Sequence, residues 1–199
     1  MINYTLFSAL ATFYFTMFFT PGPNNAMLTA SGMKFGFIRT LPHLIGIPLG
    51  HILQIGLTCF GFTKLFLAYP QIQLYMKILC FLYLIYLSWK MIGSFSLVQK
   101  QTGRPLKIYE AFLFQFINPK AWSIAMAVAS GFFPSEENIL KGVAFVTITA
   151  ATICFPTISL WALFGSSLRK FVKNIVVKKI IEYILAIMLI LTGIFILIK

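Results

Sequence analysis

The chain is poor in acidic residues: its 199 residues include no aspartate and only four glutamates. It has two histidines and three cysteines, and none of them is clustered with other residues that commonly bind a metal. This shortage excludes a paired-carboxylate active site and a cluster of metal ligands, and we find no nucleophile beside a base. We therefore expect no enzyme activity, no metal and no cofactor.

Charged residues of either sign are also scarce, at 10% of the chain, whereas 59% of the residues are hydrophobic. A soluble domain has roughly a quarter charged residues, so this chain has too little polar material to cover a surface in water. Six stretches are long and apolar enough to span a bilayer: about 4–32, 41–63, 72–94, 110–133, 139–167 and 180–198. The prediction is an all-α integral membrane protein with one transmembrane domain over residues 1–199.

The net charge of +12 is spread between the apolar stretches rather than gathered in one patch. This distribution favours contact with lipid headgroups and argues against nucleic acid as a partner. One side of the predicted membrane has most of the basic residues: Lys34, Arg39, Lys90, Lys100, Arg104, Lys107, Arg169, Lys170, Lys173, Lys178 and Lys179. The other side has Lys64, Lys77, Lys141 and Lys199. The positive-inside rule then places both termini outside the cytoplasm.

Proline interrupts two of the apolar stretches at nearly matching places in the two halves of the chain, about 1–99 and 100–199. One break runs from Thr20 to Asn25, and the other is Asn118-Pro119-Lys120. Paired interrupted helices in corresponding repeats indicate the substrate site of a transporter. We predict a 3+3 inverted repeat in which helices 1 and 4 are broken near the middle of the membrane. The alternative is that the prolines only kink packed helices.

The chemistry of these breaks suits a zwitterion. Pro21 and Pro23 have no N–H group, so the carbonyl groups of Met17 and Phe19 lose their helical donors. Thr20 and Asn118 are expected to cap new half-helices, whose free N–H groups would bind a carboxylate. The freed carbonyl groups, with Asn24 and Asn25, would bind an ammonium. The predicted substrate site therefore consists of Thr20, Pro21, Gly22, Pro23, Asn24, Asn25, Asn118, Pro119 and Lys120.

Lys120 and His51 are the two ionisable residues deep in predicted spans. A cation at the depth of Lys120 usually pairs with an anion or lines a pathway, although it could also point into a vestibule without contacting substrate. His51 is a candidate proton carrier because histidine changes protonation near neutral pH. The alternative is a neutral His51 that is hydrogen-bonded inside the bundle. We expect His43 to lie at the membrane interface.

The second predicted helix also carries polar and small residues that support the site. Gln54 and Thr58 share one helical face with His51. Gly46 and Gly50 form a small-residue motif against which a neighbouring helix can pack closely. Such glycine-lined helices also permit a homodimer.

The sequence resembles the LysE/RhtB amino-acid exporter family over essentially its whole length. The resemblance is carried by Phe19-Thr20-Pro21-Gly22-Pro23-Asn24, by Gly46 and Gly50, and by Phe116-Ile117-Asn118-Pro119-Lys120-Ala121. Within the family the chain looks most like the cysteine/O-acetylserine exporter branch, in residues 20–26, 83–94 and 111–120. The resemblance implies export of small amino acids, such as cysteine, O-acetylserine, homoserine or threonine-like compounds, across the bacterial inner membrane. It also implies proton-coupled antiport. Many relatives carry a polar or acidic residue in helix 2 or helix 5, where this chain has His51 and Pro156.

Three classes of function compete. An exporter that alternates access around the two breaks explains the matched prolines and the deep lysine. A membrane-embedded enzyme would need a catalytic group, and we recognise none in this sequence. A channel or scaffold without active transport explains a helical bundle but not the paired breaks.

Overall fold

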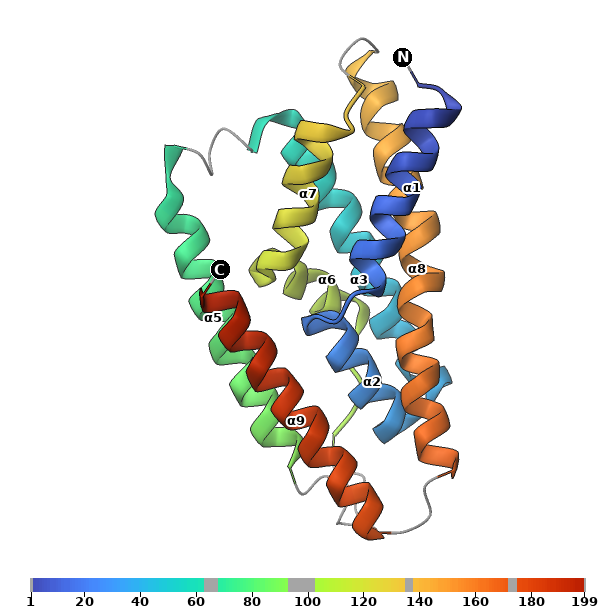
Figure 1. Cartoon of the computed structure of the whole chain (residues 1–199), viewed down its shortest axis with the longest axis vertical. Helices are drawn as coiled ribbons and strands as arrows, with labels where there is room; N and C mark the ends of the chain where they lie inside the picture. The colour runs from blue at the N-terminus through green and yellow to red at the C-terminus, as the bar shows by residue number, and fades with distance from the viewer. Residues whose placement is uncertain (1, 63–67, 93–102, 135–137, 172–174, 199) are drawn as a thin grey trace.

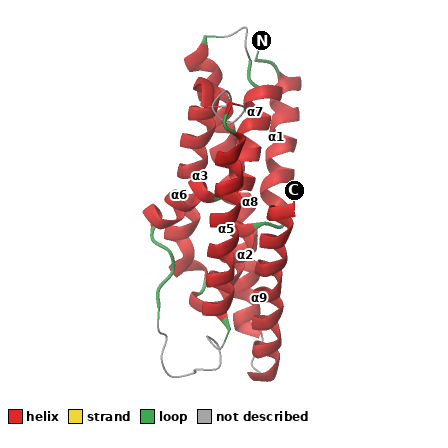
Figure 2. Cartoon of the chain, turned by 90° about the vertical axis from the view of Figure 1, so that its left-hand side faces the viewer, coloured by secondary structure: helices red, strands yellow, loops and turns green. Residues whose placement is uncertain are grey.

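A computed structural model describes the whole chain except residues 1, 63–67, 93–102, 135–137, 172–174 and 199. The described residues form helices and loops, with no strand among them (Figure 2), so the predicted all-α class is confirmed. The elements are α1 (Tyr4–Phe19), α2 (Pro23–Phe35), α3 (Phe37–Leu57), a π-helical turn η1 (Thr58–Phe62), α5 (Pro70–Met91), α6 (Ile108–Ile117), α7 (Pro119–Gly131), α8 (Ile139–Phe171) and α9 (Ile175–Ile198).

Both predicted interruptions are present. The first apolar stretch divides into α1 and α2 at residues 20–22, and the fourth divides into α6 and α7 at Asn118. The other internal prolines do not end their helices, because α3 continues through Pro42 and Pro48 and α8 continues through Pro156. Among the prolines inside the predicted apolar stretches, those at the two breaks separate one helix from the next, whereas Pro42, Pro48 and Pro156 do not.

Helix length differs between the continuous and the broken segments. In the described part of the chain, Phe37–Gly61 and Ile139–Arg169 are long and apolar enough to cross a membrane. The four half-helices α1, α2, α6 and α7 contain 16, 13, 10 and 13 residues. Each is shorter than the about 20 residues that a span requires. A broken segment can therefore cross a membrane only as a pair of half-helices.

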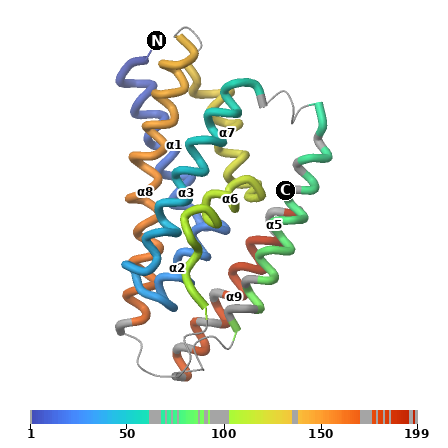
Figure 3. The backbone as a smooth tube through the Cα atoms, turned by 180° about the vertical axis from the view of Figure 1, so that it is seen from behind, coloured from blue at the N-terminus to red at the C-terminus, as the bar shows by residue number. Residues whose placement is uncertain are grey.

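Each long helix packs against the broken helix of the other half (Figures 1 and 3). α3 lies along α6 and also contacts α7, while α8 lies along α1 and α2. α3 and α8 contact each other, and α5 pairs with α9 on one side of the bundle. An inverted repeat would produce this exchange of partners, but the repeat itself stays a prediction. The expected junction between the halves, near residues 99 and 100, lies outside the described residues.

Glycines allow these helices to approach one another. A Cβ atom on Gly46 would lie 2.3 Å from the carbonyl oxygen of Ile108, and one on Gly50 would lie 2.5 Å from Cγ of Gln115. The predicted close-packing role of these two glycines is therefore confirmed, and their neighbour is α6. Because α6 covers them, they do not form an open face for a second copy, and the homodimer stays a prediction without their support.

Two of the basic residues, Lys34 and Arg169, lie at the end of the bundle where α2 ends and α3 begins, which is the lower end in Figure 1. A guanidinium nitrogen of Arg169 lies 3.2 Å from the position that a Cβ atom on Gly36 would take. Nζ of Lys34 lies 3.9 Å from the corresponding position on Gly103. These basic residues were expected on one side of the membrane, and the fold brings them to one end. Which side of the membrane that end faces stays a prediction.

Candidate substrate site between the two broken helices

The two breaks meet through direct side-chain contacts. Nζ of Lys120, at the start of α7, donates to the carbonyl oxygen of Thr20 at 2.8 Å, to the Thr20 hydroxyl at 3.0 Å and to the carbonyl oxygen of Pro21 at 3.2 Å. The amides of Asn24 in α2 and Gln115 in α6 exchange two hydrogen bonds, of 2.8 and 3.2 Å. The fold thus joins residues from the two halves of the chain into one site.

Every backbone carbonyl group from residue 17 to residue 21 accepts a hydrogen bond from a side chain. The donors are Thr20 to Met17, Asn25 to Phe18 and Thr20, Trp161 to Phe19, and Lys120 to Thr20 and Pro21. The carbonyl groups of Met17 and Phe19 were expected to be free for a ligand, but in this structure Thr20 and Trp161 donate to them. The reason is that backbone polar groups away from water need a partner, and the protein supplies its own donors.

The two breaks are capped in different ways. Asn118 caps α7, since its side-chain oxygen accepts from the backbone N–H of Lys120 at 3.1 Å and Pro119 takes the first helical position. The expectation that Thr20 caps α2 is wrong: Thr20 ends α1, and its hydroxyl donates back to Met17. Pro23, rather than Pro21, is the first residue of α2, so the cap position falls on Gly22, which has no side chain. The N-terminus of α2 is consequently the one without a side-chain cap.

A chain of buried amides supports the break from α3. Nε2 of Gln54 donates to the carbonyl oxygen of Gln115 at 2.8 Å, and the Thr58 hydroxyl donates to the carbonyl oxygen of Gln54 at 2.6 Å. Nε2 of Gln115 also donates to the carbonyl oxygen of Ala111. Gln115 was missed by the sequence analysis, although a single glutamine in the run Ala-Phe-Leu-Phe-Gln-Phe-Ile is a visible signal. It connects Asn24 to the predicted polar face of α3.

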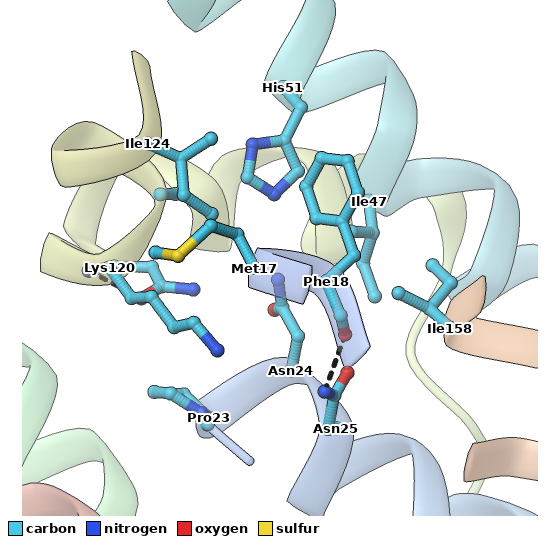
Figure 4. A pocket seen from close by; sticks show the side chains of 13 residues that line it. Met17, Phe18, Pro23, Asn24, Asn25, Ile47, His51, Lys120, Ile124 and Ile158 are labelled. Atoms are coloured by element: carbon cyan, nitrogen blue, oxygen red, sulfur yellow. Dashed lines mark hydrogen bonds between the residues drawn. The ribbon is translucent and has the colours of Figure 1, made fainter. Parts of the chain in front are cut away.

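A narrow pocket lies beside Lys120 (Figure 4). It offers about 20 Å³ to a water-sized sphere, which is room for roughly one water molecule. Of the predicted residues, those that line it are Gly22, Pro23, Asn24, Asn25, His51, Asn118 and Lys120. The remaining lining residues are apolar and were not predicted: Met17, Phe18, Ile47, Ala121, Ile124 and Ile158. The pocket is partly open, and polar residues of both breaks line it beside these apolar side chains.

The other predicted residues lie around this pocket rather than in its lining. Thr20 and Pro21 reach it through their contacts with Lys120. Pro119 opens α7, and Gly46 and Gly50 hold α6 against α3. Gln54 and Thr58 belong to the amide chain described above.

His51 faces the pocket from the side opposite to Asn24 and Asn25 (Figure 4). Its ring packs edge-on against Phe18, with centroids 5.1 Å apart. Within the described residues, its buried Nδ1 atom and the Oε1 atom of Gln54 have no hydrogen-bond partner. His43 is also buried inside the bundle, with 1% of its surface exposed, and its depth in the membrane stays a prediction. Both histidines of α3 are therefore buried, and of the two it is His51 that lines the pocket.

Replacing Asn25 with alanine is expected to destabilise the first break. Nδ2 of Asn25 donates to the carbonyl oxygens of Phe18 and Thr20, each at 2.8 Å. Leaving a buried acceptor unpaired costs about 1–3 kcal/mol, and Thr20 would keep its bond from Lys120. Thermal unfolding in detergent should show a lower midpoint. Asn138→Ala, which removes an exposed cap of α8, is the control and should have the smaller effect; an equal effect would show that Asn25 does not hold the break.

The chain matches the LysE type translocator family over residues 15–199. The cysteine/O-acetylserine efflux proteins of Escherichia coli strain K12 and of Shigella sonnei strain Ss046 are each 26% identical to it, over 90% of this chain and 95% of theirs. The protein of the same name from Escherichia coli O139:H28 is 28% identical, over 81% of this chain and 83% of its own. No solved structure matches the chain significantly.

Proposed function

We propose that this chain, which belongs to the LysE type translocator family, exports a small neutral amino acid that binds between its two broken helices. The contact of Lys120 with Thr20 and Pro21 is the observation that carries this proposal, because it places a cation where both breaks meet. The proteins of this family are transporters, which sets the enzyme alternative aside. The names of the relatives favour cysteine, O-acetylserine or a similar amino acid as the substrate.

The geometry suits both ends of a zwitterion. The N-terminus of α2 has no side-chain cap, and the partial positive charge of a helix N-terminus favours a carboxylate. Just past the C-terminus of α1, whose partial negative charge favours a cation, the carbonyl oxygens of Thr20 and Pro21 accept from the Lys120 ammonium. Ile47 and Ile124 line the pocket and would contact the substrate side chain. The two ends of one broken helix thus provide opposite charges within a few residues of each other.

Transport would require the pocket to open alternately to the two sides of the membrane. The support for this is the exchange of partners between the halves, in which α3 packs on α6 and α8 packs on α1 and α2. A 3+3 inverted repeat within a single domain, residues 1–199, would allow one half to rock against the other. We place the protein in the bacterial inner membrane, with the basic end in the cytoplasm and both termini outside it.

His51 is the proposed proton carrier, and His51→Gln is expected to remove the response of efflux to pH. Glutamine is polar but does not titrate, so binding would persist while acceleration by an imposed pH gradient is lost. Initial rates in proteoliposomes across a series of external pH values measure this. His43→Gln is the matched control, because His43 is buried on the same helix and does not line the pocket. A pH profile unchanged in His51→Gln would remove His51 from the mechanism.

The proposal as a whole is tested by uptake into everted inner-membrane vesicles, in which an exporter accumulates its substrate. We expect saturable, protein-dependent uptake of at least one small neutral amino acid from a panel that includes cysteine, O-acetylserine, homoserine and threonine. An imposed pH gradient should increase that uptake. A panel in which no amino acid accumulates above vesicles without the protein would overturn the proposal.

A further inference from the structure

We propose that Lys120 is an internal substitute for the ammonium group of the substrate. In the structure its Nζ lies in what we assign as the ammonium subsite, which consists of the carbonyl oxygens of Thr20 and Pro21 and the Thr20 hydroxyl. When an amino acid binds, its ammonium takes these acceptors and Lys120 moves to its carboxylate. This inference rests on the proposed function and specifies how the same site recognises its ligand.

The surroundings of Lys120 are those of a general ammonium site. An ammonium group has three N–H donors, and in the described structure Lys120 finds three acceptors, all of them neutral oxygens. A cation inside a membrane is expected to pair with an acid where one is present. The one glutamate whose side chain is described, Glu110, is held instead by Arg104 and by the backbone N–H of Lys107. Nothing in these contacts is specific to lysine rather than to another ammonium.

The proposed carboxylate position lies close to the present position of the Lys120 side chain. That side chain lies across Gly22, so that a Cβ atom on Gly22 would be 2.9 Å from Cδ and 3.1 Å from Nζ of Lys120. Gly22 is also the N-cap residue of α2, which has no side-chain cap and where the substrate carboxylate is proposed to bind. Thr20 and Pro21 are exposed, so a ligand can reach the acceptors once the lysine withdraws.

Because Lys120 must find an anion when it leaves the carbonyl oxygens, it makes the site select an amino acid over a simple amine. An amine without a carboxylate would displace the lysine and leave it with no anion, so that two cations would share one weakly polar site. Such an unpaired charge is costly. An amino acid brings the carboxylate that Lys120 needs after it has left the carbonyl oxygens. The protein therefore needs no acidic residue to reject amines, in keeping with the scarcity of acids in the chain.

The test compares cysteine with cysteamine, its decarboxylated analogue, which keeps the ammonium but lacks the carboxylate. Both compounds compete under reducing conditions for transport of the labelled amino acid. In the wild-type protein we expect cysteine to compete and cysteamine to have no effect. In Lys120→Met the acceptors are empty, so cysteine affinity should fall and cysteamine binding should become at least about tenfold tighter, equal to about 1.4 kcal/mol. Because Lys120→Met transports poorly, ligand binding to the purified variant is measured by thermal shift and calorimetry. Lys120→Arg keeps the cation and should still reject cysteamine.

A second variant provides chemical rescue. Lys120→Cys should bind cysteamine, and alkylation of that cysteine with 2-bromoethylamine, which rebuilds a lysine-like ammonium, should abolish this binding. Cysteamine competing as well as cysteine with the wild-type protein would overturn the inference, even if neither variant folds. So would folded Lys120→Met and Lys120→Cys that both fail to bind cysteamine. Each of these outcomes leaves the proposed function intact, since wild-type transport of an amino acid tests that separately.

Discussion

Lys120→Ala is expected to abolish export while the protein stays folded and inserted. Removing one partner of a desolvated charge contact costs about 2–5 kcal/mol, which is a loss of roughly 30-fold or more in affinity. The fold should tolerate the change, because Thr20 keeps its hydrogen bond from Asn25 and Pro21 lies exposed. Initial rates of cysteine uptake into everted vesicles, normalised to the amount of inserted protein, measure the effect.

The control for this variant is another lysine-to-alanine change on a described helix. Lys141 lies exposed in the first turn of α8 and does not line the pocket. Lys141→Ala should therefore export at the wild-type rate. If Lys120→Ala, folded and inserted to the same extent, also exported at that rate, Lys120 would have no part in transport.

Gly165→Ala is expected to separate α2 from α8 and to reduce both stability and export. A Cβ atom on Gly165 would lie 2.1 Å from the carbonyl oxygen of Thr29, and one on Gly32 would lie 2.2 Å from that of Ala162. The obstacle in each case is backbone, so the helices themselves must move. Overpacking of this kind costs about 1–3 kcal/mol. Because α2 begins with Pro23, Asn24 and Asn25, the same movement would displace the substrate site.

The measurement is the thermal midpoint of the purified variant in detergent, together with its export rate. Gly56→Ala is the matched control, since Gly56 lies inside α3 and the nearest atom to its added Cβ would be 4.0 Å away. Alanine is about 1 kcal/mol more favourable than glycine in a helix interior, so this control should be neutral or slightly stabilised. A Gly165→Ala protein with the stability of the control would show that α2 and α8 do not need glycine to pack.

The positions of the two breaks could be predicted from sequence because proline acts locally. The absence of an N–H group and the preference of asparagine for helix caps both operate within a few residues, and Asn118 and Pro119 behave as these rules require. Thr20 was predicted to cap α2 but follows the end of α1 instead. The sequence contains two prolines, Pro21 and Pro23, that could each take the first position of α2. Local rules identify the candidates in such a case but do not decide between Pro21 and Pro23.

The partners of the break could not be predicted, because they come from distant parts of the chain. Trp161 of α8 donates to Phe19 across 142 positions of sequence, and the Asn24–Gln115 pair spans 91. The apolar side of the pocket also depends on distant packing. Ile124 and Ile158 line the pocket because α7 and α8 pack against the break, and nothing in their local sequence marks them. The expectation of free carbonyl groups failed for this reason: backbone chemistry shows which acceptors lose their helical donors, and tertiary packing decides what replaces them.

The central claim is that an amino acid binds between the two broken helices, and a structure determined with bound cysteine tests it most directly. The account predicts the ligand carboxylate at the N-terminus of α2, within hydrogen-bonding distance of Lys120. It predicts the ligand ammonium on the carbonyl oxygens of Thr20 and Pro21. Cysteine bound away from both breaks, for example between α5 and α9, with Lys120 still on Thr20 and Pro21, would contradict the account.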